Sequence, residues 1–308
     1  MEHSAQYVAV VGGANVDIGG MPDRELIEGD SNPGRVRVSL GGVGHNIARN
    51  LSLLGVKTVF LTALGRDEYG LRIARDCEEN GVDCSEILRA EDPTSTYLFI
   101  TDGAGDMRLA ISDMAICRRI TPEWLETKKR VLEGAAAVVA DANLPAETLR
   151  WIAENSVSPV FADPVSVTKA EKLRPLLGRL HTVKPNRLEA ELLGGVPIRS
   201  REDLEWAADR LLETGLGRVF ISLGSRGVYC ADEKERLLQP CCPARAVNTT
   251  GAGDAFMAGL VWSHLRGLGL AETARAAQAA AAVAVEGAET INPALSEETL
   301  TAKTREAI

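Results

Sequence analysis

A run of small residues leads into an aspartate between positions 248 and 259, which read N-T-T-G-A-G-D-A-F-M-A-G and open an apolar, helix-like stretch. Such a turn leaves backbone N–H groups free at a helix N-terminus, where the helix dipole also favours an anion. We therefore predict an anion hole from the amides of Gly251, Ala252 and Gly253, with Asp254 beside a transferring group. The alternative is that Asp254 only caps the helix and the glycines only form a turn.

A second glycine-rich turn precedes another helical pattern at positions 41–48, which read G-G-V-G-H-N-I-A. Gly42 could let the backbone approach sugar hydroxyls closely, and Asn46 would add one hydrogen-bond donor and one acceptor. The alternative is a tight turn in which Asn46 is a local cap.

Polar residues also follow several apolar runs of strand length. In open α/β sheets, ligands bind beyond the carboxyl ends of the strands, so these groups are predicted to line one crevice. They are Asn15, Asp17, Asp141, Asn143, Asp163 and Ser222.

The elements that must position these groups alternate between strands and helices. Strand-length apolar runs occupy 7–11, 58–63, 136–140, 160–162 and 219–223, with helical spacing between them. This alternation predicts an α/β fold with a mainly parallel sheet covered on both faces, in one domain over residues 1–308. Two segments, about 17–40 and 94–112, carry turn and hairpin chemistry. They predict either a peripheral hairpin or a small β-sheet lid over the ligand cleft.

Composition excludes several classes of protein. The 308 residues carry a formal charge of −9, which argues against a general nucleic-acid binder. No apolar run reaches the ~18 residues of a membrane span, and the N-terminus does not resemble a signal peptide. The six cysteines are scattered without a C-x-x-C pair, as expected of reduced thiols in a cytoplasmic protein. The first strand lacks the third glycine of a G-x-G-x-x-G turn, and no G-x-x-x-x-G-K-[ST], G-x-S-x-G or H-E-x-x-H motif occurs.

Taken together, the two glycine-rich segments resemble the signature motifs of the PfkB (ribokinase-like) family of carbohydrate and nucleoside kinases. Residues 41–46 with Gly55 and Gly65 match the N-terminal motif, residues 248–261 match the C-terminal motif, and the resemblance extends over 7–292. Between them, residues 184–189, K-P-N-R-L-E, resemble the family's N-x-x-E element. The resemblance implies a three-layer sandwich with a small β-sheet lid and an ATP-dependent phosphorylation of a sugar hydroxyl.

The resemblance also implies roles for individual residues. Asp254 would accept the hydroxyl proton, Asn186 would position phosphate or its bound water, and Glu189 would hold Mg²⁺ through water. The sugar hydroxyls would be held by Asn15, Asp17, Gly42 and Asn46, with Asp113 and Asn143 near the base. The adenine of ATP would lie near Ser222, Gly224, Gly227 and Gln278. The loop at 288–292 resembles a monovalent-cation (K⁺) site, and lid strands of relatives often pair, which implies a homodimer.

Further strings, such as 13–17, 30–34, 112–114 and 181–191, are similar to the branch of the family that phosphorylates pseudouridine at its 5′-hydroxyl. Another ribonucleoside or ribose is the alternative substrate, and a non-catalytic nucleoside sensor is a further one. His45 departs from the arginine expected in that branch. Its side chain could meet phosphate or the nucleobase, with a charge that depends on pH, or it could simply face solvent.

Overall fold

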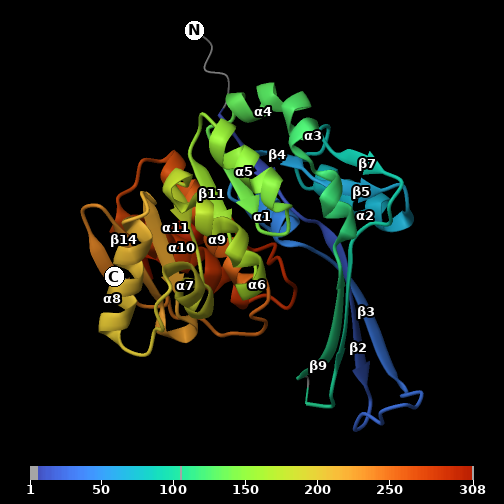
Figure 1. Cartoon of the computed structure of the whole chain (residues 1–308). Coiled ribbons are helices and arrows are strands. Elements are labelled where there is room, and N and C mark those ends of the chain that lie inside the picture. The colour runs from blue at the N-terminus through green and yellow to red at the C-terminus, as the bar shows by residue number, and fades with distance from the viewer. Residues whose placement is uncertain (1–5, 105, 307–308) are drawn as a thin grey trace.

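The main sheet runs through the body of the molecule with helices on both faces (Figure 1). The computed structural model describes residues 6–104 and 106–306. Within them the sheet has nine strands in the order β15-β14-β13-β12-β11-β10-β1-β4-β6, and all neighbours from β13 to β6 are parallel. These strands are β1 (Tyr7–Val11), β4 (Lys57–Leu61), β6 (Val82–Asp83), β10 (Ala137–Asp141), β11 (Val160–Asp163), β12 (Thr182–Val183), β13 (Arg218–Ser222), β14 (Val228–Asp232) and β15 (Arg236–Gln239).

Both faces of this sheet are buried because successive strand side chains enter different cores. In β1, Val8 and Val10 belong to one core, whereas Ala9 and Val11 belong to the other. The first core contains α1 (Val43–Leu53), α2 (Glu68–Glu79), α9 (Ala252–Leu265), α10 (Leu270–Val285) and α11 (Glu297–Glu306). The second contains α3 (Pro122–Thr127), α4 (Lys129–Gly134), α5 (Ala146–Asn155), α6 (Val167–Ala170), α7 (Arg187–Gly194) and α8 (Arg201–Leu212). The predicted three-layer α/β arrangement is confirmed.

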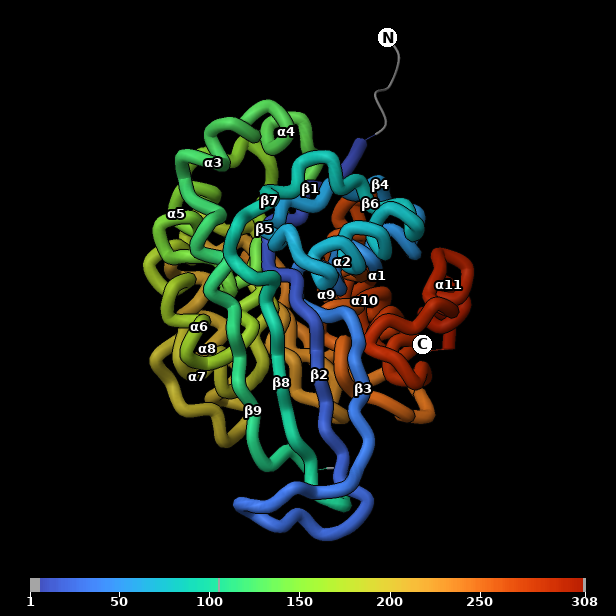
Figure 2. The backbone as a smooth tube through the Cα atoms, turned by 90° about the vertical axis from the view of Figure 1, so that its right-hand side faces the viewer, coloured from blue at the N-terminus to red at the C-terminus, as the bar shows by residue number. Residues whose placement is uncertain are grey.

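A separate four-stranded sheet projects from the body (Figure 1), and Figure 2 shows its strands running side by side. Its order is β3-β2-β8-β9, with β2 (Asn15–Pro22), β3 (Gly34–Gly41), β8 (Thr96–Thr101) and β9 (Met107–Asp113). Strands β2 and β8 pair in parallel, and the two outer pairs are antiparallel. The predicted small sheet is therefore present, and two segments far apart in the sequence build it.

The apolar run at 58–63 is predicted as one strand, and this is wrong. The chain leaves the main sheet after β4, and Ala63–Gly65 form β5, which pairs with β7 (Leu88–Ala90) in a third sheet. The bend lies at Thr62. The pairing of β4 with β1 ends at Leu61, and the carbonyl of Thr62 accepts a hydrogen bond from the amide of Leu88. Across the described ranges, no helix is long and apolar enough to cross a membrane.

Candidate active site

The two glycine-rich segments meet at one hydrogen bond. Asp254 lies in the first turn of α9, and Asn46 lies in the first turns of α1. The Nδ2 of Asn46 donates to Oδ2 of Asp254 at 2.8 Å, across a separation of 208 residues. Both side chains are buried, and among the described residues the Asp254 carboxylate accepts from the Asn46 amide and from no backbone amide of α9, so Asp254 is not a mere helix cap. A carboxylate and an amide are thus held together at the start of two packed helices.

The turn before Asp254 requires a glycine at position 251 and is tightly packed at position 253. Gly251 has a left-handed φ of 81°, and a Cβ added there would lie 2.2 Å from the carbonyl oxygen of Thr290. A Cβ added at Gly253 would lie 3.2 Å from Nζ of Lys184. The predicted anion hole therefore packs against the 288–292 loop on one side and has a buried ammonium group on the other.

Lys184 has no predicted role, yet it occupies the centre of this site. Its side chain is almost completely buried, and its Nζ lies 3.2 Å from Oδ2 of Asp163. Burial alone would lower the pKa of Lys184, but the carboxylates of Asp163, Glu189 and Asp254 outweigh it and raise that pKa. The ammonium is therefore a fixed positive charge at the N-terminus of α9.

Buried carboxylates outnumber the cations around Lys184, and their pKa values reflect this. Burial raises the pKa of Asp254 to about 8, with a further contribution from the charge of Asp163. Burial likewise raises the pKa of Asp141 to about 6, although the amides of Gly13 and Asn143 donate to it. Burial also raises the pKa of Glu189. Clusters of buried carboxylates with strongly shifted pKa values are typical of functional sites.

The predicted sugar-binding residues lie at the base of the small sheet. Asp17 lines a cavity of about 850 Å³ between that sheet and the body, and Nδ2 of Asn15 donates to its Oδ1 at 2.6 Å. A Cβ on Gly41 would lie 2.3 Å from Oδ2 of Asp17. Gly42 has a φ of 100°, and a Cβ there would meet the backbone of Ala14 at 2.6 Å. The glycine pair therefore brings the backbone of α1 close to the strand that carries Asp17.

Asp113 and Asn143 come together, but not with Asp17. Both line a second cavity of about 560 Å³ at the end of β9, together with Lys172. The Oδ1 of Asn143 already accepts a hydrogen bond from Nζ of Lys169 at 2.5 Å, and Asp113 accepts from a backbone amide. Among the described residues, Asp17 is the predicted substrate ligand that lines the larger cavity, Asp113 and Asn143 line the smaller one, and Asn15, Gly42 and Asn46 line neither.

Asn186 and Glu189 form a capping box at the start of α7. The Oδ1 of Asn186 accepts from the amide of Glu189 at 3.0 Å, and Oε2 of Glu189 accepts from the amide of Asn186 at 2.8 Å. The N-x-x-E spacing is itself a known helix-start signal, which sequence reasoning could have used. Asn186 also forms a parallel bridge with Ser222 at the end of β13.

The other predicted ATP ligands lie nearby in the fold. Gly224 and Gly227, both with positive φ, flank the turn after β13, and Gln278 is buried in α10, which packs on α9. Of the described residues, none of the predicted ATP ligands lines either of the two cavities.

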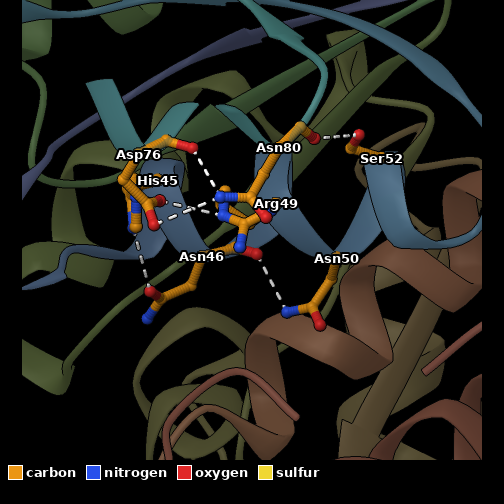
Figure 3. Close-up of polar contacts among 7 residues, drawn as sticks. All are labelled: His45, Asn46, Arg49, Asn50, Ser52, Asp76 and Asn80. Atoms are coloured by element: carbon orange, nitrogen blue, oxygen red, sulfur yellow. Dashed lines mark hydrogen bonds and ion pairs between the residues drawn. The ribbon is translucent and has the colours of Figure 1, made fainter. Parts of the chain in front are cut away.

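His45 is buried, so the interpretation as a solvent-facing residue is wrong. Its Nε2 lies 3.0 Å from Oδ2 of Asp76, which also contacts Nε of Arg49 at 2.9 Å (Figure 3). Burial acts to raise the pKa of Asp76, but these two neighbours outweigh it and lower that pKa. His45, Asp76 and Cys77 have ligand atoms within 4.8 Å of one another, but Arg49 already supplies a cation to the carboxylate there.

Known proteins are similar to this chain over nearly its whole length. The model of the pfkB family carbohydrate kinases matches residues 5–297. The chain is 41% identical to the pseudouridine kinase of Escherichia coli (strain K12) over 94% of each chain. The ribokinase of Thermotoga maritima superposes with a TM-score of 0.88 at 25% identity, covering 97% of this chain and 99% of that one. The ribokinase of Arabidopsis thaliana, solved with ribose and ATP, shares the fold with a TM-score of 0.86 at 24% identity, over 98% and 99% of the two chains.

Proposed function

The chain belongs to the pfkB family of carbohydrate kinases and is a phosphotransferase. We propose that it transfers the γ-phosphoryl group of ATP to the 5′-hydroxyl of pseudouridine. The observation that carries the proposal is the bond between Asn46 and Asp254, which joins the two signature segments into one buried site. The 41% identity to a pseudouridine kinase supports the choice of nucleoside.

In this proposal Asp254 orients the substrate hydroxyl and accepts its proton. Because burial raises the pKa of Asp254 to about 8, its carboxylate is far more basic than an exposed aspartate. An alcohol is still a much weaker acid, so proton transfer comes late, as the bond to phosphorus forms in a loose transition state. We assign the anion hole to the amides of Gly251, Ala252 and Gly253 with the ammonium of Lys184. The amide of Ala252 donates to the carbonyl oxygen of Thr249 at 3.4 Å and would exchange that contact for the phosphate. Preorganised donors of this kind typically contribute about 3–4 kcal/mol to transition-state stabilisation.

The residues around Lys184 fit a divalent cation. Glu189, Asp163 and Asp254 are buried carboxylates whose combined charge Lys184 alone does not balance. We assign the metal to Glu189, through water, with Asn186 positioning phosphate or its bound water. Mg²⁺ would neutralise charge on the phosphate oxygens when bound. A monovalent cation such as K⁺ would take backbone carbonyls of the 288–292 loop, which packs against Gly251.

On the acceptor side, Asp17 accepts hydrogen bonds from two ribose hydroxyls, and Asn15, Gly42 and Asn46 complete the contacts. Asp113 and Asn143 lie beyond them in the second cavity, as candidates for the base. Another ribonucleoside or ribose is the alternative substrate, because these residues contact the sugar. A nucleoside sensor without turnover is less well supported, since Asp254 and Glu189 are both present. The adenine of ATP would lie near Ser222, Gly224, Gly227 and Gln278.

The test is ATP turnover against pseudouridine, uridine, adenosine, inosine, ribose and fructose. We expect the highest kcat/KM with pseudouridine, and loss of turnover in Asp254→Asn. Equal kcat/KM for all nucleosides would refute the substrate assignment, and full activity of Asp254→Asn would refute the role of the base.

We also propose a homodimer that pairs the outer faces of the small sheets. Strand register places Ile18, Val38, Leu98 and Ile111 in one row and Val36, Ile100 and Leu109 in the next. Asp17 and Tyr97 share the opposite face and line the large cavity, which Val38 of the edge strand also borders. Several of these apolar side chains are exposed. Leu109→Glu with Ile111→Glu should convert a dimer into a monomer in sedimentation equilibrium, and an unchanged mass would contradict the pairing.

Finally, we propose one kinase domain over residues 1–308, with the small sheet inserted into it, and a cytoplasmic location. The free thiols support that location, since most of them are buried and unpaired. The small-molecule partners are the nucleoside and ATP, with neither nucleic acid nor membrane as a partner. Retention in the cytoplasmic fraction after cell lysis tests the location.

A further inference from the structure

The side chains of Asp76, His45, Asn46 and Asp254 form a continuous chain of polar contacts from α2 through α1 to α9. Nε2 of His45 meets Asp76 at 3.0 Å, and its Nδ1 lies 3.3 Å from Oδ1 of Asn46 (Figure 3). The Nδ2 of the same amide reaches Asp254 at 2.8 Å. The exposed fraction of the His45 residue is 1%, and that of Asn46 is 5%, so the middle of the chain is shielded from bulk water.

Hydrogen-bond chemistry restricts how protons can be placed along this chain. An ionised carboxylate only accepts, a neutral imidazole has one donor and one acceptor, and an amide has a donor end and an acceptor end. If Asp254 is ionised, Nδ2 of Asn46 must face it, and Oδ1 then needs an N–H on Nδ1 of His45. Nε2 must also carry a proton, because it faces the carboxylate of Asp76. With Asp254 ionised, every contact is satisfied only if His45 is an imidazolium.

A second arrangement satisfies the same contacts. If His45 is neutral with its proton on Nε2, the amide of Asn46 must turn so that Nδ2 donates to Nδ1 of His45. Oδ1 of Asn46 then faces Asp254, which must be protonated to donate to it. The two arrangements hold the same number of protons. They differ by one proton moved from His45 to Asp254 and by a half-turn of the amide.

We propose that His45 is a positioning residue that shares one proton with Asp254 through the Asn46 amide, so that protonation of His45 favours the ionised form of Asp254. The proposal rests on the proposed role of Asp254 as the base of phosphoryl transfer. The titratable and charged groups that face His45 are Asp76 and Cys77 from α2, Asp17 from β2 and Arg49 from α1. Asp76 is itself fixed, because Nδ2 of Asn80 lies 3.4 Å from its other oxygen.

The test measures ionisation directly by NMR, from the carboxyl carbon of Asp254 and from the ring nitrogens of His45. In the unmodified chain both ring nitrogens of His45 should be protonated wherever Asp254 is ionised. His45→Gln should move the ionisation midpoint of Asp254 upward by about one pH unit, the tenfold effect of one net hydrogen bond. Linkage requires Asp254→Asn to shift the titration of His45 by the same amount in the opposite direction. His264→Gln, at the far end of α9, is the matched control and should leave Asp254 unchanged.

Asn46→Leu tests whether the coupling between His45 and Asp254 runs through the Asn46 amide or is an attraction of charges through space. In that background His45→Gln should move the midpoint of Asp254 by less than about a third of a pH unit, because the linking amide is gone. A shift of equal size with and without Asn46, or an unprotonated Nδ1 of His45 while Asp254 is ionised, would overturn the proposal. If His45→Gln does not fold, Asp76→Asn makes the same test from the other side of the ring.

Kinetics connect the shared proton to turnover. The acid limb of kcat/KM should move upward in His45→Gln by the same amount as the midpoint of Asp254, whereas a purely structural defect would lower the whole profile without moving it. An unmoved limb in an active variant counts against the proposal. The NMR readouts do not depend on turnover, so full activity of Asp254→Asn would refute the base while leaving the shared proton measurable.

Discussion

Replacing Asp254 by Asn should stabilise the protein, and the gain should grow with pH. The side chain is buried and hydrogen-bonded to Asn46, and an asparagine of the same shape can keep that contact. Burial raises the pKa of Asp254 to about 8, whereas an unfolded aspartate titrates near 3.9. The folded chain therefore binds this proton more tightly, and its free energy of unfolding falls as pH rises between these two values.

The size of the effect follows from the distance between these two pKa values. Of that interval, the part from pH 5 to pH 8 spans roughly three pH units, and each pH unit changes the free energy of unfolding by about 1.4 kcal/mol. The stability advantage of Asp254→Asn should thus grow by about 4 kcal/mol between pH 5 and pH 9. In a chain of this size that corresponds to a melting-temperature difference of roughly 8 °C.

Urea unfolding at pH 5, 7 and 9, followed by circular dichroism, measures the difference. Asp23→Asn, which changes an exposed carboxylate of the small sheet's connecting loop, is the matched control and should show no such trend. If the curves for Asp254→Asn and the unmodified chain stay parallel across this range, the folded protein does not hold the carboxylate in its neutral form, and the reasoning fails.

Three further outcomes follow from the site. Lys184→Met leaves buried carboxylates without their cation, so the free energy of unfolding should fall by roughly 3–5 kcal/mol at pH 8. The loss should be smaller at pH 5, because protonation of the carboxylates relieves their charge. Equal losses at the two pH values would count against the electrostatic cause. Gly42→Ala should destabilise the protein by more than about 2 kcal/mol, because φ is 100° and the new Cβ would meet backbone atoms. Gly55→Ala is the control, with a φ of 74° and open space around the Cβ, and should cost only about 1 kcal/mol. Similar losses of the two variants in thermal unfolding would contradict this reasoning. Glu189→Gln keeps a capping side chain but removes its charge, so the Mg²⁺ concentration for half-maximal turnover should rise about tenfold. Glu191→Gln is the control. An unchanged Mg²⁺ concentration for half-maximal turnover in Glu189→Gln would place the metal elsewhere.

Part of this site was predictable because its signals are local. Asp254 and Asn46 each follow glycines at the start of a helical pattern, and the sequence pattern alone places each at a helix N-terminus. Lys184 was not predictable, because its role depends on carboxylates from three other elements that converge only in the fold. The burial of His45 depends in the same way on Asp76, 31 residues away on another helix.

Sequence patterns also failed to predict those parts of the secondary structure that depend on contacts between segments distant in sequence. The run at 58–63 is uniformly apolar, so nothing in it marks the bend at Thr62 where the chain changes sheets. Strands β6 and β12 are two residues long and have no pattern of their own; their neighbours in the main sheet define them. Contacts between segments distant in sequence therefore decide what local patterns leave open.

The position of α9 and α10 has a consequence for how the protein is made. They cover one face of the sheet that β1 begins, yet α9 starts 241 residues after β1 ends. At roughly 5–20 residues per second, a ribosome needs about 12–50 s to bridge that interval. During this time part of the apolar face of the early strands lacks its permanent cover, and nascent chains stalled before residue 252 should be cut by protease where the finished protein resists. Synthesis itself, rather than the completed fold, is the stage at which this kinase is most exposed to chaperones and to aggregation.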